Sequence, residues 1–164
     1  MEGLHAPPER LRELGRDLRL GQPDRPVRTT AMKKQRFISD AVREPADRMW
    51  SNCLRIDDLI MISGMTARGQ DGETVLGDTA HEQARVVFGK IKNLVEAAGA
   101  VMDDIVKMTI FVTDMRDNAG VWKARQEFFS GDFPACSLVE VSALAKPEIL
   151  LEIEAIAVAG CSVD

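Results

Sequence analysis

The chain has 164 residues, of which 45% are apolar and 29% are charged, and this composition is typical of one globular domain. A formal net charge of −5 disfavours a protein whose main task is to bind a nucleic-acid backbone. No apolar run reaches the roughly 20 residues that span a bilayer, and the start of the sequence lacks the apolar core of a secretory signal. The three cysteines are too few and too widely spaced for a disulfide framework or a zinc site, so we expect a cytoplasmic protein with reduced thiols.

Residues 1–31 differ from the rest of the chain, and we interpret them as an extension that precedes a domain over residues 32–164. The extension contains six arginines and four prolines, and three leucines at helical spacing predict a short amphipathic helix over residues 8–20. Many arginines are typical of a mitochondrial transit peptide, but Glu9, Glu13 and Asp17 argue against one. The simpler interpretation is a leucine stripe that docks on the domain or on a neighbouring subunit.

Regular patterns begin after the extension. Residues 51–56 predict a strand, and the apolar run over residues 59–63 predicts a second strand that ends at Gly64. Thr79 is followed three residues later by Glu82, which predicts a capping box at the start of a long helix. An apolar stripe at the 3.6-residue period continues from that cap.

Gly99 is expected to end this helix, because glycine adopts the left-handed backbone conformation at little cost. Residues 105–112 then predict a β-branched strand, and residues 116–129 predict a second helix. Two further strands are predicted over residues 136–143 and 150–158. The order of these elements predicts an α+β fold in which two helices pack on one face of a mixed sheet.

The last predicted strand places Glu152 and Glu154 on one side and apolar residues on the other. Two carboxylates on one strand face need either solvent or a polar cleft. The sequence leaves both interpretations open: a solvated face at a sheet edge, or a carboxylate that lines an interface pocket and orients water.

Other chemical motifs are sparse. His81 is expected on the surface of a helix and His5 lies in the extension; neither has metal-ligand spacing, and we expect no metal. The sequence has no nucleophile elbow, P-loop or dinucleotide-binding motif, so it does not support Ser/His/Asp catalysis or nucleotide binding. Cys136 has no histidine nearby in the sequence to activate its thiol, and its residue type alone indicates a small buried apolar side chain.

Four segments, in their order and spacing, resemble the RidA/YjgF family: LIMISGMTA, HEQARVVFGKIKNLVEAAGAVMDDIVKMTIFVTDM, FPACSLVEVSAL and LLEIEAIAVAG. The resemblance covers residues 50–160 and does not include residues 1–31. It implies a chorismate-mutase-like α+β fold that assembles as a homotrimer, with ligand clefts between subunits. Active members of the family hydrolyse enamine and imine acids to ketoacids and ammonia without a cofactor, so the resemblance implies that none is needed.

The resemblance also assigns roles to individual residues. Glu152 matches a glutamate that positions the attacking water, and Ser63 matches a serine that lines the cleft. Trp50 stands where a tyrosine is usual and Trp122 where an asparagine is usual, which implies a cleft of different shape. Cys136 stands where the family has an arginine that binds the substrate carboxylate through two hydrogen bonds, a contact that a thiol cannot make.

The missing arginine predicts that the standard reaction on small 2-imino acids is impaired. Arg68, Arg55 and Lys146 are candidate replacements for its positive charge. The leading hypothesis is a trimer that binds, and can hydrolyse, a different small metabolite between its subunits. The alternative is a non-catalytic ligand-binding or regulatory protein on the same scaffold. A third hypothesis follows the older family labels, endoribonuclease and translation initiation inhibitor, and the acidic net charge disfavours it.

Overall fold

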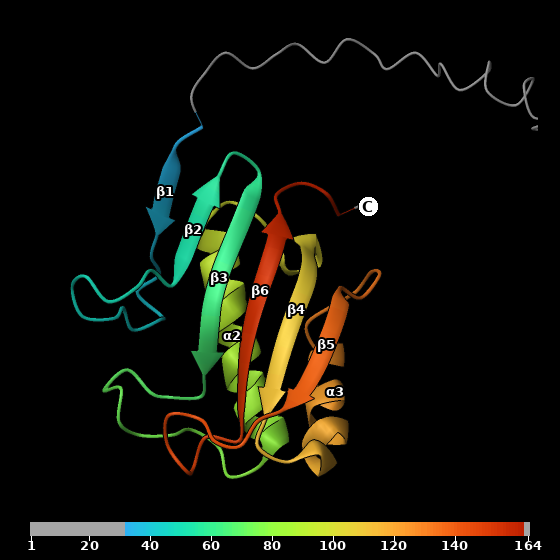
Figure 1. Ribbon diagram of the computed structural model, residues 1–164. Coiled ribbons are helices and arrows are strands. Elements are labelled where there is room, and N and C mark those ends of the chain that lie inside the picture. Colours follow the sequence, from blue (N-terminus) through green and yellow to red (C-terminus); the bar gives the residue numbers. More distant parts are fainter. Residues whose placement is uncertain (1–31, 163–164) are drawn as a thin grey trace, which may run out of the picture. The chain divides into compact units, whose positions relative to one another are not determined.

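The computed structural model describes residues 32–162, and the helix predicted over residues 8–20 lies outside that range. Figure 1 shows one sheet with two helices on a single face. The strands are β1 (Lys34–Phe37), β2 (Cys53–Ile56), β3 (Leu59–Thr66), β4 (Ile105–Val112), β5 (Ala135–Glu140) and β6 (Leu151–Val158). The helices are α2 (Ala80–Ala97) and α3 (Asn118–Gln126), with 3-10 turns at Met102–Asp104 and Met115–Asp117.

The strands of the sheet follow the order β1-β2-β3-β6-β4-β5. All neighbouring strands are antiparallel except β4 and β5, which run parallel and are joined through α3. The predicted two-layer α+β architecture is therefore confirmed. The short edge strand β1 was not predicted, because its sequence KQRF is polar and exposed and has no alternating pattern.

Strand β3 does not end at Gly64, and this part of the sequence prediction is wrong. The strand continues to Thr66 because its pairing with β6 shifts register between Ile62 and Met65, which marks a β-bulge. Strand β2 pairs with β3 only as far as Ile62, so within residues 32–162 no strand lies beside the outer edge of β3 beyond the bulge. The bulge thus creates an irregular edge where side chains from other elements can gather.

Helix α2 begins and ends as its sequence predicts. Thr79 accepts a hydrogen bond from the backbone of Glu82, whose side chain in turn accepts from the backbone of Thr79, so the capping box is present. Gly99 has φ of +80°, the left-handed conformation expected after the last turn. The buried stripe of α2 packs against the sheet and includes Val87, Phe88, Ile91, Leu94 and Val95. Within residues 32–162, no helix is long and apolar enough to cross a membrane.

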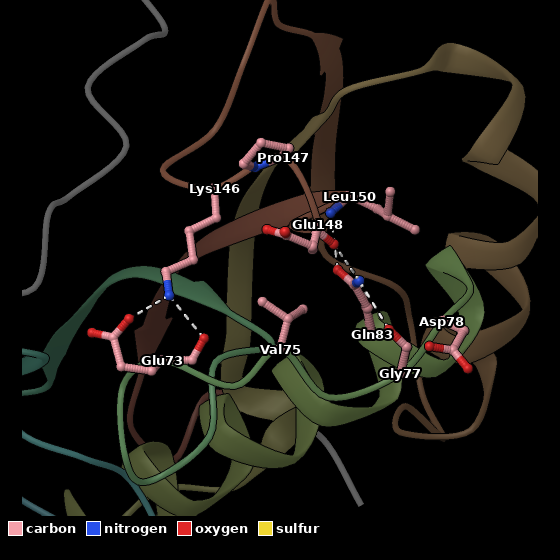
Figure 2. Close-up of a pocket in the computed structure, with 9 residues that line it drawn as sticks. All are labelled: Glu73, Val75, Gly77, Asp78, Gln83, Lys146, Pro147, Glu148 and Leu150. Carbon is pink, nitrogen blue, oxygen red and sulfur yellow. Dashed lines mark hydrogen bonds and ion pairs between the residues drawn. The ribbon is translucent and has the colours of Figure 1, made fainter.

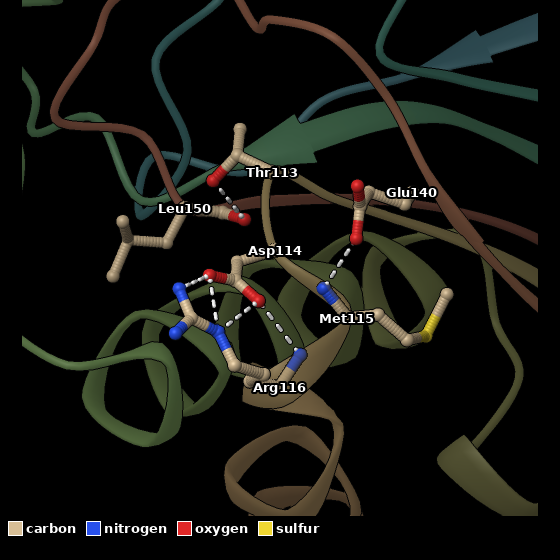
Figure 3. Close-up of polar contacts among 6 residues, drawn as sticks. All are labelled: Thr113, Asp114, Met115, Arg116, Glu140 and Leu150. Carbon is tan, nitrogen blue, oxygen red and sulfur yellow. Dashed lines mark hydrogen bonds and ion pairs between the residues drawn. The ribbon is translucent and has the colours of Figure 1, made fainter.

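Helix α3 is shorter than the predicted range of 116–129 because both of its ends are 3-10-like turns. At its start Asp114 accepts a hydrogen bond from the backbone N–H of Arg116 at 2.8 Å, and Glu140 of β5 accepts one from Met115 at 2.7 Å (Figure 3). Thr113 donates its backbone N–H to the carbonyl of Leu150 at 3.0 Å. These bonds fix the start of α3 against β5 and the residue before β6.

Asp104 connects the start of β4 to the segment that follows β6. Its Oδ2 accepts hydrogen bonds from the backbone N–H groups of Val101 and Gly160, each at 3.1 Å, and its Oδ1 accepts one from Ser162 at 2.9 Å. Only 2% of Asp104 is exposed. Burial alone would raise the pKa of Asp104, but the three N–H donors outweigh burial and lower that pKa to about 2.

We predict that Asp104→Asn lowers the free energy of unfolding at neutral pH by on the order of 2 kcal/mol, because a pKa drop of roughly two units corresponds to about that energy. The folded-state pKa lies below the ordinary value of 3.8, so this stabilisation is present above that value and is lost as the pH falls toward 2. Urea unfolding at neutral pH and near pH 2 measures the effect, with the exposed-site variant Asp132→Asn as control. A loss of equal size at both pH values would contradict the charge-based explanation.

Candidate functional site

Glu152 lies on the sheet face that the helices leave uncovered. Its neighbours Leu151 and Ile153 are fully buried on the helix side, and alternation therefore turns the half-buried Glu152 side chain the other way. The carboxylate occupies the space beside Gly64 in the β3 bulge: a Cβ at position 64 would lie 1.9 Å from Glu152 Oε1. Glycine at this position is what leaves room for the Glu152 carboxylate.

The surroundings of Glu152 make its carboxyl a better proton acceptor than an exposed glutamate. Burial raises its pKa above the usual 4.5, the positive charge of Arg68 opposes that rise, and the nearby charge of Glu154 adds to it. A carboxyl group whose pKa is raised by partial burial is typical of general acid–base sites.

Ser63 and Trp50 lie close to the same bulge. The Ser63 hydroxyl donates a hydrogen bond to the carbonyl of Ser51 at 2.8 Å, and the indole Nε1 of Trp50 donates to Asn52 Oδ1 at 3.1 Å. Trp50, Asn52 and Gly64 help to line a small cavity of about 80 Å³. The structure therefore brings three of the sequence-predicted site residues, Glu152, Ser63 and Trp50, to one region of the chain.

Cys136 and Trp122 lie elsewhere in the chain. Cys136 pairs with the fully buried Met108 of β4, so its side chain points to the helix-covered face of the sheet, opposite to Glu152. Trp122 is on α3, which packs on that same face. Within one chain, the two halves of the predicted site do not meet.

Arg125 is a residue of this second group that the sequence did not single out. Its guanidinium carbon lies 4.5 Å from the centre of the Trp122 ring and 4.7 Å from that of Phe133, so the cation is held between two aromatic rings. Its Nε is buried and has no hydrogen-bond partner among the described residues. Trp122 and Arg125 lie three residues apart on one helix face, so their spacing could have indicated the contact between them. It could not have indicated the contact of Arg125 with Phe133.

The thiol of Cys136 is not activated by these neighbours. Burial raises its pKa, and the positive charges of Arg125 and Lys107 lower it only in part, so the thiol stays neutral at physiological pH. Cys53 is fully buried, and burial with the nearby charge of Glu44 raises its pKa to about 11. Neither cysteine has the properties of a nucleophile.

The three candidate replacement cations have different positions. Arg55 donates hydrogen bonds to the carbonyls of Asp57 and Ala98 and does not line the cavity beside Gly64. Lys146 lies in a separate cavity of about 690 Å³, where its Nζ donates to Glu73 (Figure 2). Only Arg68 of the three lines the cavity beside Gly64 and acts electrostatically on Glu152.

The sheet order, the single helical layer and the glutamate on the bare face define an α+β protein of the chorismate-mutase-like fold. The model of the family described as Endoribonuclease L-PSP matches residues 41–159. A RutC family protein of Pyrococcus abyssi is 37% identical over 127 residues, which cover 77% of this chain and 98% of that protein.

Two solved structures extend the comparison. A protein of unknown function from Pseudomonas aeruginosa matches with a TM-score of 0.71 and 38% identity, over 82% of this chain and all of that one. YyfA of the conserved Rid protein family from Yersinia pestis matches with a TM-score of 0.70 and 30% identity, over 77% of this chain and all of that one. The chain belongs to the RidA/YjgF family, whose family model is described as Endoribonuclease L-PSP.

We predict that Glu152 titrates above 4.5 and that Arg68→Ala moves its pKa further upward, because the substitution removes the positive charge that favours the carboxylate. NMR titration of the Glu152 carboxyl carbon measures this without any ligand. Arg55→Ala is the matched control, since it removes the same type of charge away from the cavity. An unchanged Glu152 titration in Arg68→Ala would show that the two side chains do not interact.

Proposed function

We propose that this protein binds a small metabolite in clefts between the copies of a homotrimer and hydrolyses it as enamine and imine deaminases do. The half-buried Glu152 carboxylate beside Gly64 is the observation on which the proposal depends. It would accept a proton from the attacking water, and a pKa raised above that of an exposed glutamate makes it a stronger base for that role. Ser63 and Trp50 would line the same side of the cleft, and no cofactor is needed for this chemistry.

The other wall of each cleft comes from a neighbouring copy in this proposal. Cys136 and Trp122 lie on the face opposite to Glu152, so they reach a Glu152 cleft only if a second chain provides them. Arg125, between its two aromatic rings, would offer that cleft a guanidinium group from α3 instead of from β5. Arg125 also acts on the Cys136 thiol through its charge and a hydrogen bond, so a carboxylate bound by Arg125 would lie near position 136 but be contacted from α3.

A non-catalytic ligand-binding protein on the same scaffold is the second candidate. The observation in its favour is Cys136, whose neutral thiol cannot form the two charge-assisted hydrogen bonds of an arginine. The two candidates differ in whether the bound ligand is hydrolysed, so a measurement of turnover distinguishes them. The endoribonuclease label of the family is disfavoured for this chain by its net charge of −5.

We predict that the wild-type protein releases little ammonia from freshly generated 2-iminopropionate or 2-iminobutyrate, and that Cys136→Arg raises this rate at least tenfold. A restored bidentate contact is worth more than the roughly 1.4 kcal/mol that a tenfold change requires. Adding Glu152→Gln to Cys136→Arg should remove the gain, because an amide cannot accept the proton of water. Ammonia release is measured under single-turnover conditions for the wild type, Cys136→Arg, Cys136→Arg with Glu152→Gln, and Cys161→Arg. The last is the matched control, because it places the arginine at another cysteine position.

Three outcomes would count against the proposal. Wild-type turnover equal to that of arginine-bearing relatives would show that Cys136 does not impair the standard reaction. A gain that survives Glu152→Gln would exclude Glu152 as the group that positions water. An equal gain in Cys161→Arg would show that an added surface arginine, at an exposed position after β6, suffices.

A further inference from the structure

A third cavity, of about 250 Å³, lies between α2 and the loop that follows β3, and it shares Arg43, Arg68 and Lys90 with the cavity beside Gly64. Its described lining includes four cationic side chains and no carboxylate. The polar residues that line it are Arg43, Arg68, Arg85, Lys90, Gln70 and Asn93. In a chain whose net charge is −5, a concave site lined by one sign of charge stands out, because such a site concentrates ions of the opposite sign.

Lys90 is partly buried beside these cations. Its Nζ donates hydrogen bonds to the backbone carbonyl of Thr66, the last residue of β3, at 2.9 Å, and to that of Arg68, two residues further on. An ammonium group has three N–H donors, so these bonds leave one for another acceptor. Burial and the neighbouring charge of Arg68 both lower the pKa of Lys90.

Arg43 is positioned by the shape of the loop opposite. Gly72 has φ of +75°, and a Cβ at that position would lie 2.0 Å from Arg43 Nη1, so the glycine leaves the space that the guanidinium occupies. Arg68 is held by a hydrogen bond from its Nε to Thr66 Oγ1 at 3.3 Å. Within residues 32–162, neither arginine forms an ion pair with a carboxylate inside 4.0 Å.

The carboxylates near this cavity neutralise it only in part. Glu44 lines the adjoining cavity beside Gly64 with the same three cations, and Arg36 pairs with it. Glu73 and Glu152 act on Arg43 and Arg68 through space but lie outside the cavity lining. Among the described residues, Arg85 is the one lining cation with a carboxylate in contact, because its Nε lies 2.7 Å from Glu127 Oε2. Three cations thus share a small space and repel one another, and a bound anion would relieve that repulsion.

We propose that this cavity binds a phosphate monoester, with the phosphate held by Arg43, Arg68 and Lys90. Guanidinium groups bind phosphate oxygens through paired hydrogen bonds, and a lysine adds a point charge. Asn93 and Gln70, at the margin, offer amide groups to the remainder of the ligand. The volume lies below the roughly 300–1,000 Å³ of sites for drug-sized ligands, so the ligand is small and the site is not a nucleic-acid track.

Isothermal titration calorimetry with inorganic phosphate and with ribose 5-phosphate tests the proposal on the full chain in dilute buffer. We expect one site per chain, a Kd near or below about 1 mM, and tighter binding of the ester. Arg43→Ala should weaken binding at least tenfold with little effect on the fold, because its side chain is exposed and forms no ion pair among the described residues. Lys90→Ala should weaken it similarly.

Lys92→Ala is the matched control. Like Lys90→Ala, it removes one lysine charge from α2, but at an exposed position where Lys92 pairs with Glu96. Unchanged phosphate binding in this control, together with the loss in Arg43→Ala, would support the site. Equal weakening in Arg43→Ala and Lys92→Ala would show general attraction to surface charge, and no saturable binding of either probe by the wild type at about 10 mM would overturn the proposal.

Discussion

The close approach of Glu152 to Gly64 is the contact on which the candidate site depends. The β-bulge in β3 shifts the pairing with β6 between Ile62 and Met65, and the absence of a Cβ at position 64 leaves room for the carboxylate. Any other residue there would have to displace Glu152, because its Cβ would overlap Oε1. Just beyond the bulge, Lys90 donates hydrogen bonds to the carbonyls of Thr66, which ends β3, and of Arg68. The two cavities adjoin there, since Arg43, Arg68 and Lys90 line both.

The second constraint is that a single helical layer gives the sheet two different faces. Glu152 belongs to the bare face, whereas Cys136 and Arg125 belong to the helix-covered one. In one chain the sheet itself separates them. A cleft that uses both groups has to form between chains, and in our proposal each copy contributes one wall to two different clefts.

The sequence predicted most of the fold because its signals were local. The capping box and the buried stripe defined α2, and alternation put Glu152 on the face away from the core. The sequence did not reveal that Gly64 lies inside a strand, because glycine is equally typical of a strand end and of a bulge. Arg125 was missed for a different reason: its contact with Phe133 depends on how α3 packs beside β5, which no local pattern encodes. Among the described residues the edge strand Lys34–Phe37 pairs on one side only, and its mostly polar sequence left no periodic signal.

A crystal structure of the assembled protein tests the central claim most directly, since that claim concerns how the chains meet. We predict a trimer in which Glu152 of each copy faces a cleft whose opposite wall contains Cys136 and Arg125 of a neighbouring copy. A structure in which Glu152 faces only solvent or its own chain, with Cys136 and Arg125 distant from every Glu152, would contradict the account.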